Sequence, residues 1–195
     1  MLMVKYLGIP FLTQNYTMIE QAKKLINDNQ PLPAVALLTQ HLTKNPKDKY
    51  ALSLRAVTLV QMGQTSEALT DVETLIAMEP ESLAYMLLRA DVLSLDGQIE
   101  KAIAAYFSIL AQKPTAGNVV LRLGALFQQQ KRWDEALKLY SNAIEQMPDF
   151  AEAWMARGAV KHHVKDKMGA AEDLRRALEL NPELAKQFEG EATVI

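Results

Sequence analysis

Few residues of this chain are spaced for chemistry, and the histidines come first among them. His162 and His163 are adjacent on a predicted helix, where successive side chains point about 100° apart and do not readily hold one metal ion. His41 stands alone in the sequence and suits an ordinary packing position. Solvated or packed helix histidines are therefore a better interpretation than metal ligands.

The motifs that usually carry catalysis or bind cofactors are missing from the sequence. It has no Gly-rich phosphate loop, no G-x-S-x-G elbow, no H-E-x-x-H motif and no close set of carboxylates. The absence of cysteine rules out disulfides and thiolate metal sites. Charged residues such as Glu135 and Lys138 alternate on outer helical faces, which a solvated surface explains. We expect no catalytic residue, no cofactor and no metal, so the chain is not predicted to be an enzyme.

The net charge of the chain limits the kinds of partner that can be expected. The 21 basic and 23 acidic residues give a net charge of −2, which creates no field that gathers nucleic acid or an anionic membrane. The segment Met1–Thr13 is apolar, but Lys5, Gly8 and Pro10 interrupt it too early for a secretory leader or a membrane span. We expect no nucleic-acid partner and no direct membrane insertion. The cytoplasm is the default location, and an exported location stays open if a leader is missing.

The sequence contains an internal repeat, which determines the helices that carry the residues described above. Five prolines and five alanines each recur at intervals of 34 residues: Pro46, Pro80, Pro114, Pro148 and Pro182, with Ala34, Ala68, Ala102, Ala136 and Ala170. A fixed period of this size is the signature of a repeat array. Apolar residues at i, i+3, i+4 and i+7 in both halves predict two antiparallel helices per repeat.

The proline frame defines five repeats, at residues 15–48, 49–82, 83–116, 117–150 and 151–184. Turns between the two helices are expected near Asn29, Gly63, Gly97, Lys131 and Lys165, and Asn and Gly tolerate positive φ there. Residues 1–14 are an N-terminal extension, for which a helix or strap over the first repeat, a frayed end and a partner-docking arm stay open. A short amphipathic helix over residues 183–190 is expected to extend into a capping tail at residues 185–195.

Small residues at two places of every repeat carry a resemblance to the tetratricopeptide repeat (TPR) family. The twentieth place holds the alanine series, and the eighth holds Ala22, Ala56, Ala90, Gly124 and Gly158. Small side chains at both places let the two helices approach closely. The first repeat departs most from the family pattern, with Pro31 and Pro33 entering its second helix. The resemblance implies an all-α fold, a right-handed solenoid of five TPR helix-turn-helix units.

A pattern of charges inside the repeats predicts ion pairs. Arg55 and Asp71 in the second repeat occupy the same two places as Arg157 and Asp173 in the fifth, while the fourth has leucine at both. We predict that each Arg–Asp pair joins the two helices of its repeat and fixes geometry more than it adds stability. Arg89 has an alanine opposite, so it must find another acceptor or reach solvent.

The TPR resemblance also implies a binding surface, because the first helices of such repeats line an extended concave groove. The partner-binding residues that this placement predicts are Tyr16, Ile19, Tyr50, Val57, Leu87, Asp91, Asn118, Leu121, Arg122, Gln128 and Met155. Leu87, Leu121 and Met155 are expected to form one apolar strip. Partial cover of such side chains by the adjacent helix is the alternative.

One TPR subclass holds the C-terminal carboxylate of chaperones with a set of Lys, Asn and Arg. The corresponding places here read Ser53, Val57, Leu88, Asn118 and Arg122, and only Arg122 fits. An anionic terminus would meet apolar side chains that cannot replace its water. We therefore predict an adaptor or chaperone-like module that binds an apolar or amphipathic segment of a partner protein. The alternative is a structural module that self-associates or assembles a complex through its faces, with a homo-oligomer as one form.

Overall fold

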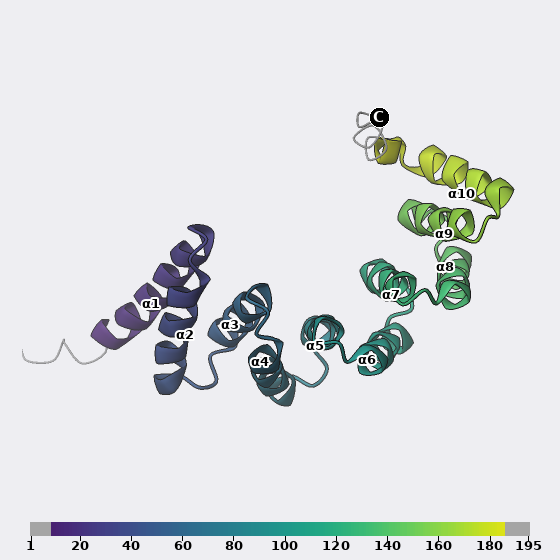
Figure 1. The fold of residues 1–195 in the computed structure, drawn as a ribbon. Coiled ribbons are helices and arrows are strands. Elements are labelled where there is room, and N and C mark those ends of the chain that lie inside the picture. Colours follow the sequence, from purple (N-terminus) through teal and green to yellow (C-terminus); the bar gives the residue numbers. More distant parts are fainter. Residues whose placement is uncertain (1–8, 186–195) are drawn as a thin grey trace, which may run out of the picture. The chain divides into compact units, whose positions relative to one another are not determined.

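The computed structural model describes the backbone of residues 9–185 and the side chains of residues 18–185. Within this range the chain forms ten α-helices and one short 3-10 helix, with no strand (Figure 1). It divides into two compact parts, Met1–Ala102 and Ile103–Ile195, which are described separately. The predicted all-α helical-repeat class is confirmed.

The N-terminal part contains five helices and the first turn of a sixth, α6, which continues into the C-terminal part. The elements are α1 (Ile9–Asn27), α2 (Pro31–Lys44), α3 (Lys49–Gln61), α4 (Thr65–Met78), α5 (Leu83–Leu95) and α6 (Ile99–Gln112). Pro31 occupies the start of α2, where its missing N–H has no intrahelical partner to lose. The prolines of the first repeat therefore begin its second helix and do not break it.

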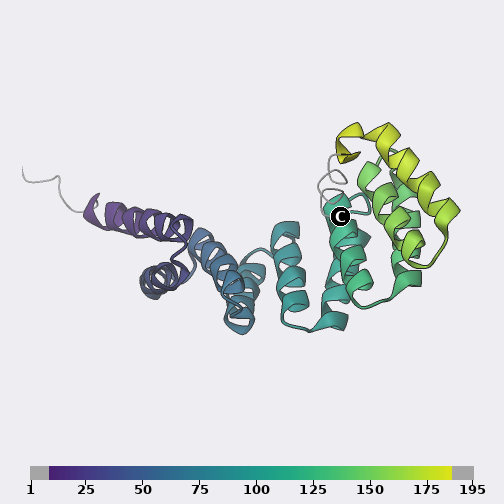
Figure 2. The ribbon, with the colours of Figure 1, turned by 45° about the horizontal axis from the view of Figure 1, so that its top comes forward.

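The C-terminal part contains two further pairs and the 3-10 helix. The elements are α7 (Gly117–Gln129), α8 (Trp133–Gln146), α9 (Ala151–His163), α10 (Lys167–Leu180) and η1 (Pro182–Ala185). Figures 1 and 2 both show α10 lying along α9, and these two helices are in contact. In η1, Leu184 is 4% exposed and packs with Ala151 and Ala177, so it covers the end of the last repeat. The rest of the predicted capping helix, including Phe188, lies outside the described residues.

Helix boundaries follow the 34-residue frame except at the N-terminus. The helices α3, α5, α7 and α9 begin at the first residue of the second to fifth predicted repeats. By contrast, α1 begins at Ile9, so its first turn reaches into the predicted extension. Pro10 falls in that first turn, where a helix tolerates proline.

The five predicted turns share one backbone feature. All have positive φ: Asn29 (56°), Gly63 (74°), Gly97 (78°), Lys131 (57°) and Lys165 (69°). A left-handed residue just after a helix ends that helix and redirects the chain. The three residues other than glycine adopt the strained conformation because the same turn is needed in every repeat.

Small residues bring the paired helices together. Ala34, Ala68, Ala102 and Ala136 are fully buried, and Ala170 is nearly so. The closest approach is at Gly124 of α7, where an added Cβ would lie 2.1 Å from the hydroxyl oxygen of Tyr140 on α8. The helix crossing therefore has no space for a side chain there.

Both predicted ion pairs are confirmed. In the second repeat Arg55 donates to Asp71 through Nε (2.8 Å) and Nη2 (2.5 Å), and in the fifth Arg157 donates to Asp173 through the same atoms, both at 2.8 Å. The two aspartates are 2% or less exposed. Lys161 also pairs with Asp173, at 3.0 Å.

Each of these arginines has a further partner on the preceding repeat. Arg55 Nη1 donates to Thr39 Oγ1 (3.0 Å), and Arg157 Nη1 donates to Ser141 Oγ (3.1 Å). Arg89, which lacks an aspartate in its own repeat, donates to Glu73 at 2.6 Å. The acceptor lies sixteen residues before the arginine in all three cases, so this place in the repeat joins neighbouring repeats.

His41 is a packed residue, as predicted, and it makes one polar contact. It is 2% exposed, and its Nε2 lies 2.7 Å from Asp48 Oδ2. The other oxygen of Asp48 accepts from the backbone N–H groups of Tyr50 and Ala51 at 3.1 Å each. Asp48 therefore caps α3 and ties α2 to it.

Candidate partner-binding face

Two apolar side chains of α3 remain open to solvent on one helix face. Tyr50 is 53% exposed and Val57 is 43% exposed. They are seven residues apart, which is close to two turns, so they project on the same side of the helix. Most large apolar residues of α3 are instead covered: Leu52 and Leu59 are each 4% exposed. The fold thus leaves this face without an internal partner.

Polar groups stand beside Tyr50. Lys23 of α1 donates to Glu20 at 3.0 Å. The hydrogen bond and charge of Glu20 raise the pKa of Lys23 above its usual range, and Tyr50 adds to the shift. Lys23 and Tyr50 belong to the first helices of the first two repeats. An apolar ring with a charged rim is a common arrangement at protein interfaces.

The other apolar residues of the predicted surface are half-buried. Ile19 packs against the core cluster that contains Ala22 and Leu38. Met155 packs against the cluster of Ala151, Ala177 and Leu184. Leu87 and Leu121 are also half-buried. These side chains contribute to internal packing and present only part of their surface to a ligand.

The predicted polar residues differ among themselves. Asn118 and Arg122 are exposed on α7, and Asp91 is half-buried on α5. Gln128 donates its side-chain N–H to the Tyr140 hydroxyl at 3.0 Å. Burial raises the pKa of Tyr140, and the Gln128 hydrogen bond partly opposes that shift. Gln128 therefore already has a role inside its repeat.

The predicted partner-binding residues are divided between the two compact parts of the chain. Ile19, Tyr50, Val57, Leu87 and Asp91 belong to the N-terminal part, whereas Asn118, Leu121, Arg122, Gln128 and Met155 belong to the C-terminal part. The side chain of Tyr16 lies outside the described residues. The predicted apolar strip from Leu87 through Leu121 to Met155 joins the two parts and stays a prediction.

The histidines and carboxylates offer no metal site in the described part of the chain. His162 and His163 are both exposed. The His163 ring packs against the Trp133 ring at a tilt of 35°, with 4.0 Å between ring centroids. Over residues 18–185, no three potential ligands among His, Asp and Glu come together. In the same range, none of the helices combines the length and apolar character needed to cross a membrane.

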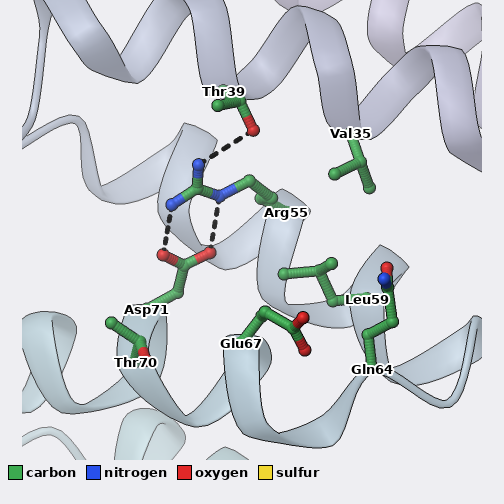
Figure 3. A pocket seen from close by; sticks show the side chains of 8 residues that line it. All are labelled: Val35, Thr39, Arg55, Leu59, Gln64, Glu67, Thr70 and Asp71. Carbon is green, nitrogen blue, oxygen red and sulfur yellow. Dashed lines mark hydrogen bonds and ion pairs between the residues drawn. The ribbon is translucent and has the colours of Figure 1, made fainter.

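Sequence reasoning missed a cavity in the N-terminal part. The cavity has a volume of about 390 Å³ and lies among α2, α3 and α4 (Figure 3). Val35 and Leu59 are apolar lining residues, and Glu67 is a charged lining residue. None of the predicted partner-binding residues lines it. The sequence pattern gave no signal of it, because Gln64 holds a place that is also Gln in the first and third repeats.

Paired helices with small crossing residues, repeated along the chain, define a helical-repeat interaction module. Tetratricopeptide repeat models match residues 53–117 and 93–160, which together span more than half of the chain. The chain belongs to the tetratricopeptide repeat family. A search of curated proteins gave no match.

Solved structures with the same fold include three TPR proteins. MamA from Desulfovibrio magneticus RS-1 is 16% identical, with a TM-score of 0.68 over 87% of this chain and 96% of that one. YrrB, a TPR protein with an unusual peptide-binding site, is 19% identical, with a TM-score of 0.60 over 90% of each chain. TTC0263 of Thermus thermophilus is 19% identical, with a TM-score of 0.61 over 92% of this chain and 97% of that one. At these identities the likeness shows the fold alone.

Proposed function

We propose that this protein is a non-catalytic adaptor that binds an apolar or amphipathic segment of a partner protein through the first helices of its repeats. The observation that carries the proposal is the exposed pair Tyr50 and Val57 on one face of α3. A TPR array presents such faces to peptides, and YrrB, which has the same fold, has a peptide-binding site. The default location of this activity is the cytoplasm.

The chemistry of the face favours an apolar ligand over an acidic one. A ligand side chain that covers Tyr50 and Val57 removes apolar area from water, which is worth about 25 cal/mol per Å². Lys23 has Glu20 as its partner, so it is not a free cation for a carboxylate. Aromatic anchors such as Tyr50 commonly dominate the binding energy of an interface.

The test is capture of partners by a Tyr50→Ser/Val57→Ser variant. Both side chains are exposed, so each substitution should change stability by no more than about 0.5 kcal/mol, and helical circular dichroism should be retained. We expect proteins captured by the wild type to be lost by this variant in quantitative mass spectrometry. Calorimetry with a captured segment should give a negative heat-capacity change, which marks apolar burial.

A matched control removes two exposed apolar side chains from second helices. Leu32 on α2 is 69% exposed and Met168 on α10 is 87% exposed. The Leu32→Ser/Met168→Ser variant should keep the captured proteins. Retention by the Tyr50/Val57 variant, or equal loss by both variants, would place the binding site elsewhere.

The second candidate function is assembly of the chain with copies of itself. The exposed pair Tyr50 and Val57 also suits this function, because a second copy of the chain can cover an exposed apolar face as a partner protein does. In that case the Tyr50/Val57 variant would change the oligomeric state, and the control variant would not.

A further inference from the structure

The first helices of the second to fifth repeats do not begin alike. In α3 the Asp48 side chain accepts hydrogen bonds from the backbone N–H groups of Tyr50 and Ala51, both at 3.1 Å. The residues that precede α5, α7 and α9 make no side-chain bond of this kind. The first N–H groups of a helix have no partner within the helix, so a capping side chain reduces fraying there. Of these four helices, only α3 has such a cap.

The capping carboxylate is itself held by a residue of α2. Its second oxygen, Oδ2, lies 2.7 Å from Nε2 of His41. One oxygen of Asp48 is therefore engaged by the start of α3 and the other by α2. The Asp48 side chain is 27% exposed, and an exposed side chain loses rotamer freedom when it is fixed. The bond to His41 keeps the carboxylate turned toward the helix.

His41 is an exception at its place in the repeat. The other four repeats have buried apolar residues there: Leu75, Ile109, Ala143 and Ala177. His41 is also buried, at 2% exposed, and its Nδ1 atom has no hydrogen-bond partner among the residues described. A buried polar atom without a partner lowers stability. Core packing alone would favour an apolar residue at this place, so the bond to Asp48 accounts for a histidine better than packing does.

The link from His41 to Asp48 acts on the helix that carries the exposed apolar pair. Tyr50 is the second residue of α3, in the turn that Asp48 caps, whereas Val57 lies in the middle of the helix. Tyr50 is 53% exposed, so surrounding side chains restrain it only in part. A binding residue that is ordered beforehand loses less conformational entropy when a ligand binds. The order of the first turn therefore matters more for Tyr50 than for Val57.

We propose that His41 is a positioning residue for the partner-binding face, because it holds the first turn of α3, and with it Tyr50, through the Asp48 carboxylate. His41 is itself too buried to touch a partner. The residue by which the first repeat departs from the other four thus serves the binding face of the second repeat. The effect on partner binding rests on the proposed function, whereas the effect on the order of α3 does not.

The test replaces His41 with leucine, the residue at the same place in the second repeat. The urea midpoint should change little, because loss of the bond to Asp48 is offset by removal of the unpaired Nδ1. Exchange of the Tyr50 and Ala51 amide protons with water, measured by nuclear magnetic resonance, should become about threefold to tenfold faster, the scale of a lost helix cap. A residue that only packs in the core would instead lower the midpoint and leave these two amides unchanged.

Two further variants identify the atoms that act. His41→Gln keeps a side-chain N–H donor with a reach similar to that of Nε2, so it should preserve slow exchange at Tyr50 and Ala51. Asp48→Ala removes the cap and should accelerate exchange at the same two amides. Adding His41→Leu to Asp48→Ala should have no further effect, since both residues act through one bond. The amide of Val57 is the internal control and should not change in any variant.

Capture of partner proteins gives the second readout. His41→Leu should reduce capture of the proteins that the wild type retains, His41→Gln should preserve it, and His41→Leu should add nothing to Tyr50→Ser. Unchanged amide exchange in His41→Leu would overturn the proposal, as would full capture by that variant or equal loss of capture by the leucine and glutamine variants. A wild type that captures no protein would reject the adaptor function, while the exchange measurement, which needs no partner, still decides whether His41 orders the first turn of α3.

Discussion

At the residue scale, the arginines of the first helices act as links of unequal strength. Arg55 and its partner Asp71 have side chains that are 20% and 3% exposed, whereas Arg89 and its partner Glu73 are 38% and 52% exposed. Burial keeps water from replacing a lost partner, so the buried aspartate depends on its arginine. The exposed glutamate does not.

This difference predicts unequal effects of removing each arginine. Arg55→Leu should lower the free energy of unfolding by about 3–5 kcal/mol, because it leaves the Asp71 carboxylate buried and uncompensated. Arg89→Leu should lower it by less than about 1 kcal/mol, as for other exposed pairs. Urea denaturation followed by circular dichroism measures both.

The fourth repeat suggests the control for this experiment. It has Leu123 and Leu139 at the two places, and they are 0% and 8% exposed. An Arg55→Leu/Asp71→Leu double variant should therefore recover most of the stability lost by Arg55→Leu. Equal loss in Arg55→Leu and Arg89→Leu would show that burial of Asp71 does not govern the effect.

At the element scale, the crossing of the two helices in each repeat depends on small residues. Ala136 of α8 has no exposed surface, and the neighbouring Gly124 has no space even for a methyl group. Close packing of this kind resists added volume, because the surrounding atoms can move only a little.

Ala136→Leu should therefore overpack the crossing of α7 and α8 and destabilise the protein by about 1–3 kcal/mol. The measurement is the shift of the urea midpoint. Ala104→Leu on α6, where the side chain is exposed, is the matched control and should be close to neutral. A neutral Ala136→Leu variant would mean that the helices can separate without penalty.

The ends and crossings of most helices could be predicted from the sequence for a physical reason. Helix ends and crossings are set by local residue types, such as glycine at positive φ in two of the five turns and the alanine that recurs every 34 residues at each crossing. The start of α1 was not predicted, because it lies outside the repeated pattern. The sixteen-residue links from arginine to the preceding repeat were missed because their acceptors are of three kinds: Thr39, Glu73 and Ser141.

Surface properties were predicted less fully than the helices. Ile19, Leu87, Leu121 and Met155 share a face by spacing, yet packing against neighbours covers each of them in part. The exposed fraction of a side chain depends on the sizes of residues from other helices, which helical periodicity does not contain.

At the scale of the whole molecule, the oligomeric state separates the two candidate functions. An adaptor that leaves Tyr50 and Val57 open for a partner should be a monomer by static light scattering when it is pure. A self-assembling structural module should give a stable oligomer in which those two residues become protected. We expect the monomer, with the same mass for the wild type and the Tyr50→Ser/Val57→Ser variant. A larger mass that falls in this variant would favour self-assembly.

Arrays of similar repeats are prone to pair out of register or to exchange repeats between copies during folding. The links between neighbouring repeats in this chain differ in chemistry, since Arg157 reaches Ser141 of the fourth repeat whereas the same place in α7 is Leu123. A fifth repeat that docked in the slot of the fourth would keep Asp173, which belongs to its own repeat, but it would lose the bond to Ser141, because the third repeat has Phe107 at that place. The difference between charged and apolar links therefore favours the native order of these repeats over such an exchange.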